Sequence, residues 1–169
     1  IQRHIEELLV SPMDETSIVI GYLAGGIIRG LFVATVVSFI ALFFTELNIK
    51  HPLLTLLVII MTAGVFSLAG LINAIFAKKF DDIAVIPSFV LAPLTYLGGV
   101  FYTVSLLPEF WQTVSRLNPI LYMVNSMRYS VLGTSDIEIM DGLLMIGGFF
   151  ILLLSVAVYL LKKGIGIRD

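Results

Sequence analysis

Long blocks of apolar residues, separated by short polar segments, make up most of the chain. A bilayer core about 30 Å thick requires about 20 apolar residues in a helix. Four blocks meet this requirement, at residues 18–45, 53–77, 83–104 and 142–161. Backbone polar groups inside lipid are satisfied only within a helix or a closed barrel, and the sequence lacks the period-two alternation of barrel strands. The pattern therefore predicts an all-α, polytopic membrane helix bundle with four transmembrane spans.

The first and third blocks are less regular than the other two. Arg29 lies well inside the first block, whereas the second and fourth blocks contain no charge. The third block contains Pro87, Pro93 and the pair Gly98-Gly99, so it is predicted to be kinked or broken. Within a membrane, backbone groups that have lost their helical hydrogen bonds are tolerated only against protein or a water-filled cavity. The break is therefore expected beside a pathway or a packed neighbour rather than in lipid.

The segment after the third block is long for a connection and far from polar. Apolar residues recur at helical spacing after Pro108, which suits a helix start, and Asn118-Pro119 suits a stop. A second short helix can follow and end at Gly133. Neither piece is long enough to span, so residues 105–133 predict an outer helical hairpin. This hairpin either re-enters the outer leaflet or lies on the membrane as an interfacial cap.

Residues 1–16 predict a short amphipathic helix that Pro12 interrupts. Its apolar and acidic residues fall on different sides, namely Ile5, Leu8 and Leu9 against Glu6 and Glu7. These residues alone leave two interpretations open, a solvated helix beside the membrane and a segment that contacts a cytoplasmic partner.

Composition agrees with a chain whose main solvent is lipid. Of the 169 residues, 59% are hydrophobic and 13% are charged, and the mean hydropathy is +1.05. A soluble domain has about 25% charged residues, so a soluble enzyme is disfavoured. The formal net charge of -2 provides no basic stripe for phosphates, which argues against a nucleic-acid partner.

Basic residues are unevenly divided between the two sides that four spans would define. Six belong to the side of the termini and three to the other side: Arg3, Lys78, Lys79, Lys162, Lys163 and Arg168 against Lys50, Arg116 and Arg128. By the positive-inside rule, this bias places both termini in the cytoplasm and residues 105–141 outside.

Few side chains within the blocks could carry chemistry. A buried arginine costs at least about 2.5 kcal/mol, so Arg29 either faces protein or water or extends to the cytoplasmic headgroups. Four glycines form two GxxxG patterns, which let another helix approach closely; they are Gly21, Gly25, Gly26 and Gly30. Asn73 is expected to form a hydrogen bond between helices.

Three aromatic residues, Tyr96, Phe101 and Tyr102, surround the glycine pair of the third block and form either an interfacial belt or part of a pathway. His4 and His51 lie in polar flanks on opposite sides, and the sequence has no cysteine, so no metal cluster is expected. A GxxxxGK(S/T) phosphate loop is also missing from the sequence. If ATP drives this protein, another chain must hydrolyse it.

Residues Pro93 to Gly133 carry an ordered set of features that is specific only in combination. They are Tyr96-Leu97-Gly98-Gly99, Phe101-Tyr102, Leu107-Pro108, Trp111, Asn118-Pro119, Arg128 and Gly133. This stretch resembles the signature region of ABC-2 type permeases, the membrane subunits of type-2 ATP-binding cassette exporters. The likeness is nearest to the bacterial YadH-like and drug or lipo-oligosaccharide exporter permeases. In addition, IEELLVSP (residues 5–12) resembles the family's ATPase-docking segment, and GYLAGGIIRG (residues 21–30) matches the start of the following span.

The resemblance implies a function, partners and site residues. It implies a bacterial inner-membrane exporter permease that forms a homodimer, binds no cofactor itself, and is driven by a cytoplasmic ABC ATPase holding ATP and Mg. The substrate would be amphipathic or hydrophobic, of the drug, lipid or glycolipid class. The residues that the resemblance implies for coupling to the ATPase are Glu6, Glu7, Leu8, Leu9, Val10, Ser11 and Pro12. Candidates for a pathway or gate are Arg29, Tyr96, Gly98, Gly99, Phe101, Tyr102 and Arg128.

The family unit usually has six spans, so the chain is expected to represent its last four. Two other classes of function stay open. One is a secondary transporter or pore that works without ATP and uses Arg29 as an anion contact. It is disfavoured because the blocks contain no carboxylate or histidine for ion coupling. The other is a purely structural membrane subunit. A neighbouring gene that encodes a phosphate-loop protein would favour the exporter over both.

Overall fold

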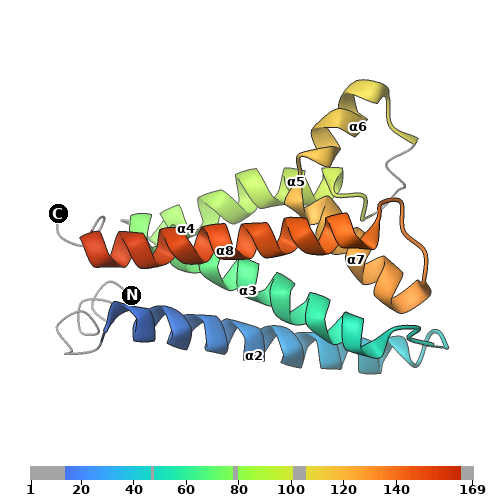
Figure 1. Ribbon diagram of the computed structural model, residues 1–169, viewed down its shortest axis with the longest axis horizontal. Coiled ribbons are helices and arrows are strands. Elements are labelled where there is room, and N and C mark those ends of the chain that lie inside the picture. The colour runs from blue at the N-terminus through green and yellow to red at the C-terminus, as the bar shows by residue number, and fades with distance from the viewer. Residues whose placement is uncertain (1–13, 47, 78–79, 101–105, 165–169) are drawn as a thin grey trace.

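The computed structural model describes residues 14–46, 48–77, 80–100 and 106–164. Every regular element in these ranges is helical (Figure 1). In chain order they are α2 (Glu15–Ala41), α3 (Pro52–Phe76), α4 (Phe80–Ile86), the π-helix η1 (Pro87–Leu91), α5 (Ala92–Leu97), α6 (Glu109–Arg116), α7 (Pro119–Leu132) and α8 (Ile139–Lys163). The all-α prediction is confirmed for the described part of the chain.

Three helices are long and apolar enough to cross a membrane. They cover Thr16–Ala41, Pro52–Phe76 and Ile139–Lys163, and they correspond to the first, second and fourth predicted spans. Proline at the first position of α3 suits a helix start, because its missing amide hydrogen would have no partner there. Gly164 ends α8 with a φ of 64°, the left-handed conformation that glycine adopts without steric cost.

The predicted third span, 83–104, does not form one uninterrupted helix of spanning length in the described residues. Its apolar helical part is Ile83–Leu97, which is shorter than the three candidate spans. Pro87 and Pro93 each remove an amide donor, and between them the helix widens to a π-turn in which Ala92 N–H donates to the carbonyl of Pro87. The helix ends at Gly98-Gly99, where Gly99 has a φ of 73°.

Helix α3 lies at the centre of the bundle and packs against α2, α7 and α8 (Figure 1). One apolar cluster joins the first turn of α2 to the last turns of α3 and α8, and its members are Ile18, Val19, Leu68, Leu71, Ile75, Ala157, Leu160 and Leu161. A second cluster joins α3, α7 and α8 through Val65, Met123 and Ile146. The outward face of α2 remains exposed and apolar, as expected for a helix that faces lipid or another protein.

The two ends of the bundle differ. Helix α2 begins and α8 ends at one end, which we call the Lys163 end, whereas α6, α7 and the connection between α2 and α3 lie at the other, the hairpin end (Figure 1). Because α3 finishes at the Lys163 end and α8 starts at the hairpin end, the run from Phe80 to Leu97 carries the chain back between them (Figure 1). This run of 18 helical residues is about 27 Å long, close to the thickness of a bilayer core.

The predicted hairpin at residues 105–133 contains two helices in its described part. Helix α6 starts directly after Pro108, and α7 starts after Asn118, whose side-chain oxygen accepts the N–H of Ile120 at 3.0 Å. Helix α7 packs into the bundle and buries six of its residues: Ile120, Leu121, Met123, Asn125, Ser126 and Ser130. Helix α6 stands away from the bundle and leaves Phe110 exposed (Figure 1).

The connection between α2 and α3 closes the end of α7. The backbone N–H groups of Lys50 and His51 donate to the carbonyls of Val131 and Ser130 at 3.2 and 2.9 Å. These carbonyls belong to the last turn of α7, where the helix itself provides no N–H donors for them. The His51 ring also stacks on Tyr129 with ring centroids 5.4 Å apart.

Candidate functional site

The broken helix α4–η1–α5 has few buried side chains and is held mainly through its backbone. Pro87 has no amide hydrogen, so the carbonyl of Ile83, four residues earlier, lacks its usual helical donor. The side chain of Asn73 on α3 donates to this carbonyl at 2.9 Å. Asn73, assigned to helix packing from the sequence, therefore joins α3 to α4.

A second hydrogen bond holds the last turn of α5. Gly98 N–H donates to Thr95 rather than to Leu94, as the helix tightens before it ends. The Nδ2 of Asn118 donates to the Leu94 carbonyl at 2.6 Å. A Cβ atom at Gly98 would lie 2.8 Å from the Ile120 side chain, so α5 and the start of α7 are in close contact.

A third contact holds the backbone just beyond α5. Arg128 on α7 donates from Nη2 to the Gly99 carbonyl at 2.8 Å, and its Nη1 pairs with Asp136 at 3.0 Å. Asn125, fully buried on the same helix, accepts the backbone N–H of Asp136 at 3.0 Å and so fixes the loop that carries this carboxylate. Arg128, predicted as a pathway or gating residue, thus joins the end of α5 to α7 and to the loop before α8.

These three contacts share one chemistry. In each, a side-chain N–H from α3 or the hairpin donates to a backbone carbonyl near a break in α4–η1–α5. At membrane depth, such carbonyls need a protein partner. The other face of the run is open, with Phe89 76% and Tyr96 63% exposed. Tyr96, a predicted pathway residue, is thus largely exposed and takes no part in these three contacts.

The two GxxxG patterns in α2 have different surroundings. Gly26 and Gly30 pack against α3, because a Cβ atom at Gly26 would overlap the side chain of Ser67 and one at Gly30 would lie 2.6 Å from Ala63 Cβ. Gly21 and Gly25 have no atom within 4 Å of such a Cβ position. Only the second pattern therefore brings the two helices together, and the first lines an open groove.

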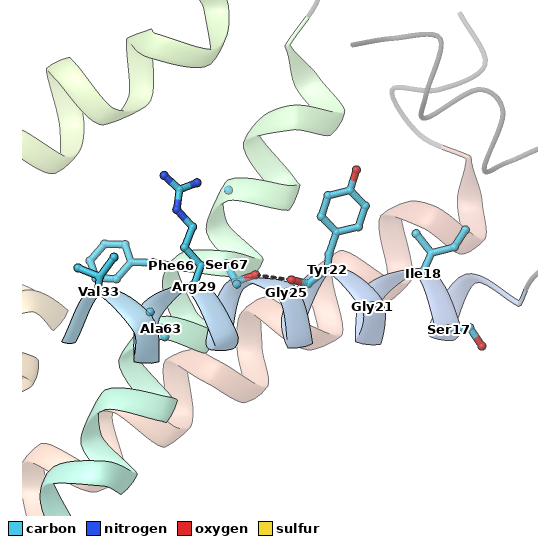
Figure 2. A pocket seen from close by; sticks show the side chains of 13 residues that line it. Ser17, Ile18, Gly21, Tyr22, Gly25, Arg29, Val33, Ala63, Phe66 and Ser67 are labelled. Carbon is cyan, nitrogen blue, oxygen red and sulfur yellow. Dashed lines mark hydrogen bonds between the residues drawn. The ribbon is translucent and has the colours of Figure 1, made fainter. Parts of the chain in front are cut away.

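This groove, the α2–α3 groove, has a volume of about 910 Å³. Figure 2 shows its floor, where the Ser67 hydroxyl donates to the Tyr22 carbonyl at 3.0 Å. Arg29 rises from α2 beside Phe66 and Val33 (Figure 2). It is the only charged residue among those that line the groove, and it forms no hydrogen bond or ion pair with the residues that the structure describes.

A second cavity of about 450 Å³ continues from the groove. The two share Gly30, Ala63 and Phe66 in their walls. The second cavity extends to the end of α5 and to α7, where Val100 and Ile120 line it, and its walls are almost entirely apolar. The groove with Arg29 and the broken end of α5 are therefore connected by a continuous set of lining residues.

Several predicted residues lie outside the described ranges. These are the candidate coupling residues Glu6 to Pro12 and the aromatic residues Phe101 and Tyr102. Conversely, sequence reasoning missed the roles of Ser67, Asn125 and Asp136. Asn118 was assigned to a helix stop, and its second role as a donor to α5 depends on a contact 24 residues away. Among the described residues, no group of three His, Cys, Asp or Glu is placed to hold a metal ion.

The described structure defines a polytopic helical membrane protein with a broken helix that is held by an α-helical hairpin. The sequence profile of the ABC-2 type transporter family matches residues 2–132. The chain belongs to this family, and the resemblance found in residues 93–133 is confirmed.

Named relatives support the same assignment. The chain is 47% identical over 168 residues to the inner membrane transport permease YadH of Escherichia coli (strain K12). This match covers 99% of this chain and 66% of that protein. It is 24% identical over 132 residues to Nodulation protein J of Rhizobium leguminosarum bv. viciae, covering 78% of this chain and 51% of that protein. The chain thus spans less than two thirds of the length of these relatives. No solved structure matches it at comparable significance.

Proposed function

We propose that this chain is the transmembrane part of an exporter permease that a separate cytoplasmic ATPase drives. The family match over residues 2–132 carries the proposal, together with the 47% identity to a protein named as an inner membrane transport permease. The sequence has no phosphate loop, so ATP hydrolysis belongs to the partner, which holds ATP and Mg. Two copies of the permease would enclose the pathway.

The bundle suits a hydrophobic or amphipathic substrate. The α2–α3 groove and the cavity that adjoins it are mainly apolar, and together they lead from α2 to the break after α5. In the proposed cycle, ATP binding moves the cytoplasmic contact made by residues 5–12 and tilts the packed helices as a rigid body. The α4–η1–α5 run is suited to move separately, since it is attached to the bundle at a few hydrogen bonds.

The proposed orientation places the Lys163 end in the cytoplasm and the hairpin end outside, and it includes α4–η1–α5 as a fourth crossing. Lys162 and Lys163 in the last turn of α8 support this orientation through the positive-inside rule. The chain has no cysteine, so single cysteines can be introduced at Thr134 and Lys163. In intact cells, an impermeant thiol reagent should label the first and not the second, and the reverse result would invert the topology.

The coupling experiment uses the full permease, reconstituted with its proposed ATPase partner. Replacing Glu7 and Leu9 with alanine should uncouple ATP hydrolysis from substrate without preventing membrane insertion. A matched control replaces an acidic and an apolar residue at the hairpin end, Glu109 and the exposed Phe110. Normal substrate-stimulated hydrolysis in the Glu7/Leu9 variant, or an equal loss in the control, would show that residues 5–12 do not couple the subunits.

A further inference from the structure

The α2–α3 groove combines an open apolar floor with one cation. Gly21 and Gly25 leave its floor free of side chains, while Gly26 and Gly30 keep the two helices packed beside it. Ile18, Val33 and Phe66 add apolar walls. Its volume of about 910 Å³ falls within the range of about 300–1,000 Å³ that ligand pockets occupy. The groove can therefore hold an alkyl chain without any change in the packing of α2 on α3.

The position of Arg29 calls for an anion. It lies near the middle of α2, a helix of 27 residues, so both ends of the helix are about 20 Å away along its axis. This separation is too large for the side chain to place its guanidinium among headgroups by extension alone. A cation at the centre of a span is costly unless it is paired. Figure 2 shows Arg29 standing clear of the contact between α2 and α3, over the lining of the groove.

The cavity beyond the groove gives the ligand a direction. It adjoins the groove at Gly30, Ala63 and Phe66 and contributes about 450 Å³ of almost purely apolar space. An amphiphile with its charged group at Arg29 can extend its chain along the groove or into this cavity. A planar guanidinium binds phosphate or carboxylate through two parallel hydrogen bonds, which adds geometric specificity to charge.

We propose that the α2–α3 groove binds an amphiphile with an anionic headgroup, phosphate or carboxylate, and that Arg29 is its headgroup contact. The inference deepens the proposed function by naming the charge of the substrate class. Only the identification of the ligand as the exported substrate rests on the proposed function. Binding to the groove itself needs neither ATP nor the ATPase. A binding experiment without nucleotide therefore tests it separately.

Dodecyl phosphate and dodecyl glucoside form a matched pair of probes, because they share the chain and only the first has an anionic headgroup. Their binding is measured on the purified full permease in a neutral detergent. Dodecyl phosphate should bind at least about tenfold more tightly, and Arg29→Gln should remove this preference, because a hydrogen bond to a charged group contributes about 1.5–3 kcal/mol. Arg29→Lys should retain part of it, and Arg116→Gln, which changes an exposed arginine on α6, should leave it intact. Equal binding of the two probes, or an unchanged preference in Arg29→Gln, would overturn the proposal.

A single cysteine at Gly25 tests what occupies the groove. The position has free space, so Gly25→Cys should fold normally and react with a maleimide. Dodecyl phosphate should slow the reaction severalfold and dodecyl glucoside, which has no anionic group, should not. A second copy or another helix seated in the groove would instead leave the cysteine unreactive or link two copies through a disulfide. Either result would overturn the proposal whether or not the complex exports a substrate.

Discussion

Asn73 and Ile83 are joined across two helices by a hydrogen bond of 2.9 Å from the side-chain amide to the backbone carbonyl. The carbonyl is the one that Pro87 deprives of a helical donor. The proline and the asparagine therefore form one unit, although they lie on different helices. In this structure, the donor that Pro87 removes from its own helix is replaced by a side chain of α3.

This relationship predicts an unusual rescue. Asn73→Leu removes the donor and should lower the free energy of unfolding by about 0.6–1.7 kcal/mol, the range of hydrogen bonds between membrane helices. Pro87→Ala restores a backbone N–H four residues after Ile83, so it should reduce the cost of Asn73→Leu. Unfolding in mixed micelles measures both single variants and the double variant. The pairing of Asn73 with Pro87 is refuted if the two effects simply add.

The glycines of α2 predict a contrast between neighbours. Gly26→Val places a side chain on Ser67 and should lower stability by about 1–3 kcal/mol, the usual cost of overpacking. Gly25→Val, one residue away, meets open space and should change stability by much less. Thermal unfolding of the two variants in the same detergent provides the comparison. Equal losses would mean that helix propensity, rather than contact with α3, determines the result.

Substitutions at Arg128 should separate the effect of its charge from the effect of its hydrogen-bond geometry. Arg128→Lys keeps the charge, but a single ammonium cannot reach Gly99 and Asp136 through the fork of two nitrogens that arginine provides. Amide hydrogen exchange at residues 97–100 should therefore become severalfold faster. Asp136→Asn should have a smaller effect, because the Arg128–Asp136 pair is partly exposed and such pairs contribute about 1 kcal/mol or less. A larger effect of Asp136→Asn would show that the ion pair, and not the Gly99 contact, holds the end of α5.

Substitutions of the two adjacent glycines after α5 should differ in whether a second substitution, at Ile120, recovers the lost stability. Gly98→Ala contacts Ile120, so shortening that residue with Ile120→Ala should recover part of the loss. Gly99 has a φ of 73°, and Gly99→Ala should cost about 1–2 kcal/mol through the backbone itself. Ile120→Ala should give no recovery there. Unfolding free energies of the three single and two double variants test this, and recovery at both positions would contradict the assigned cause at Gly99.

Local patterns in the sequence predicted most helix positions. Length and apolar composition located α2, α3 and α8, while Pro108 marked the start of α6 and Asn118-Pro119 marked its end. The third block was expected to break, and the structure adds how, with a π-turn after Pro87 and an end at Gly98-Gly99. The π-turn could not be predicted because it depends on which carbonyls receive the remaining backbone N–H groups of a helix that contains two prolines.

The candidate site was less accessible to sequence reasoning, because its contacts join distant segments. Arg128 stood out within the family signature, but its acceptor at Gly99 is 29 residues away. Likewise, two GxxxG patterns look equivalent in the sequence, and only the position of α3 distinguishes Gly26 and Gly30 from Gly21 and Gly25. Arg29 was noticed as a lone charge, and the open floor beside it became visible only in three dimensions (Figure 2).

The attachment of α4–η1–α5 through main-chain carbonyls affects which substitutions its sequence can tolerate. Asn73, Asn118 and Arg128 recognise peptide oxygens, which every amino acid carries. The exposed side chain of Phe89, on the other face of this run, can therefore be exchanged without loosening these contacts. Substitutions of this kind can accumulate while the path of the helix stays fixed by the same three donors.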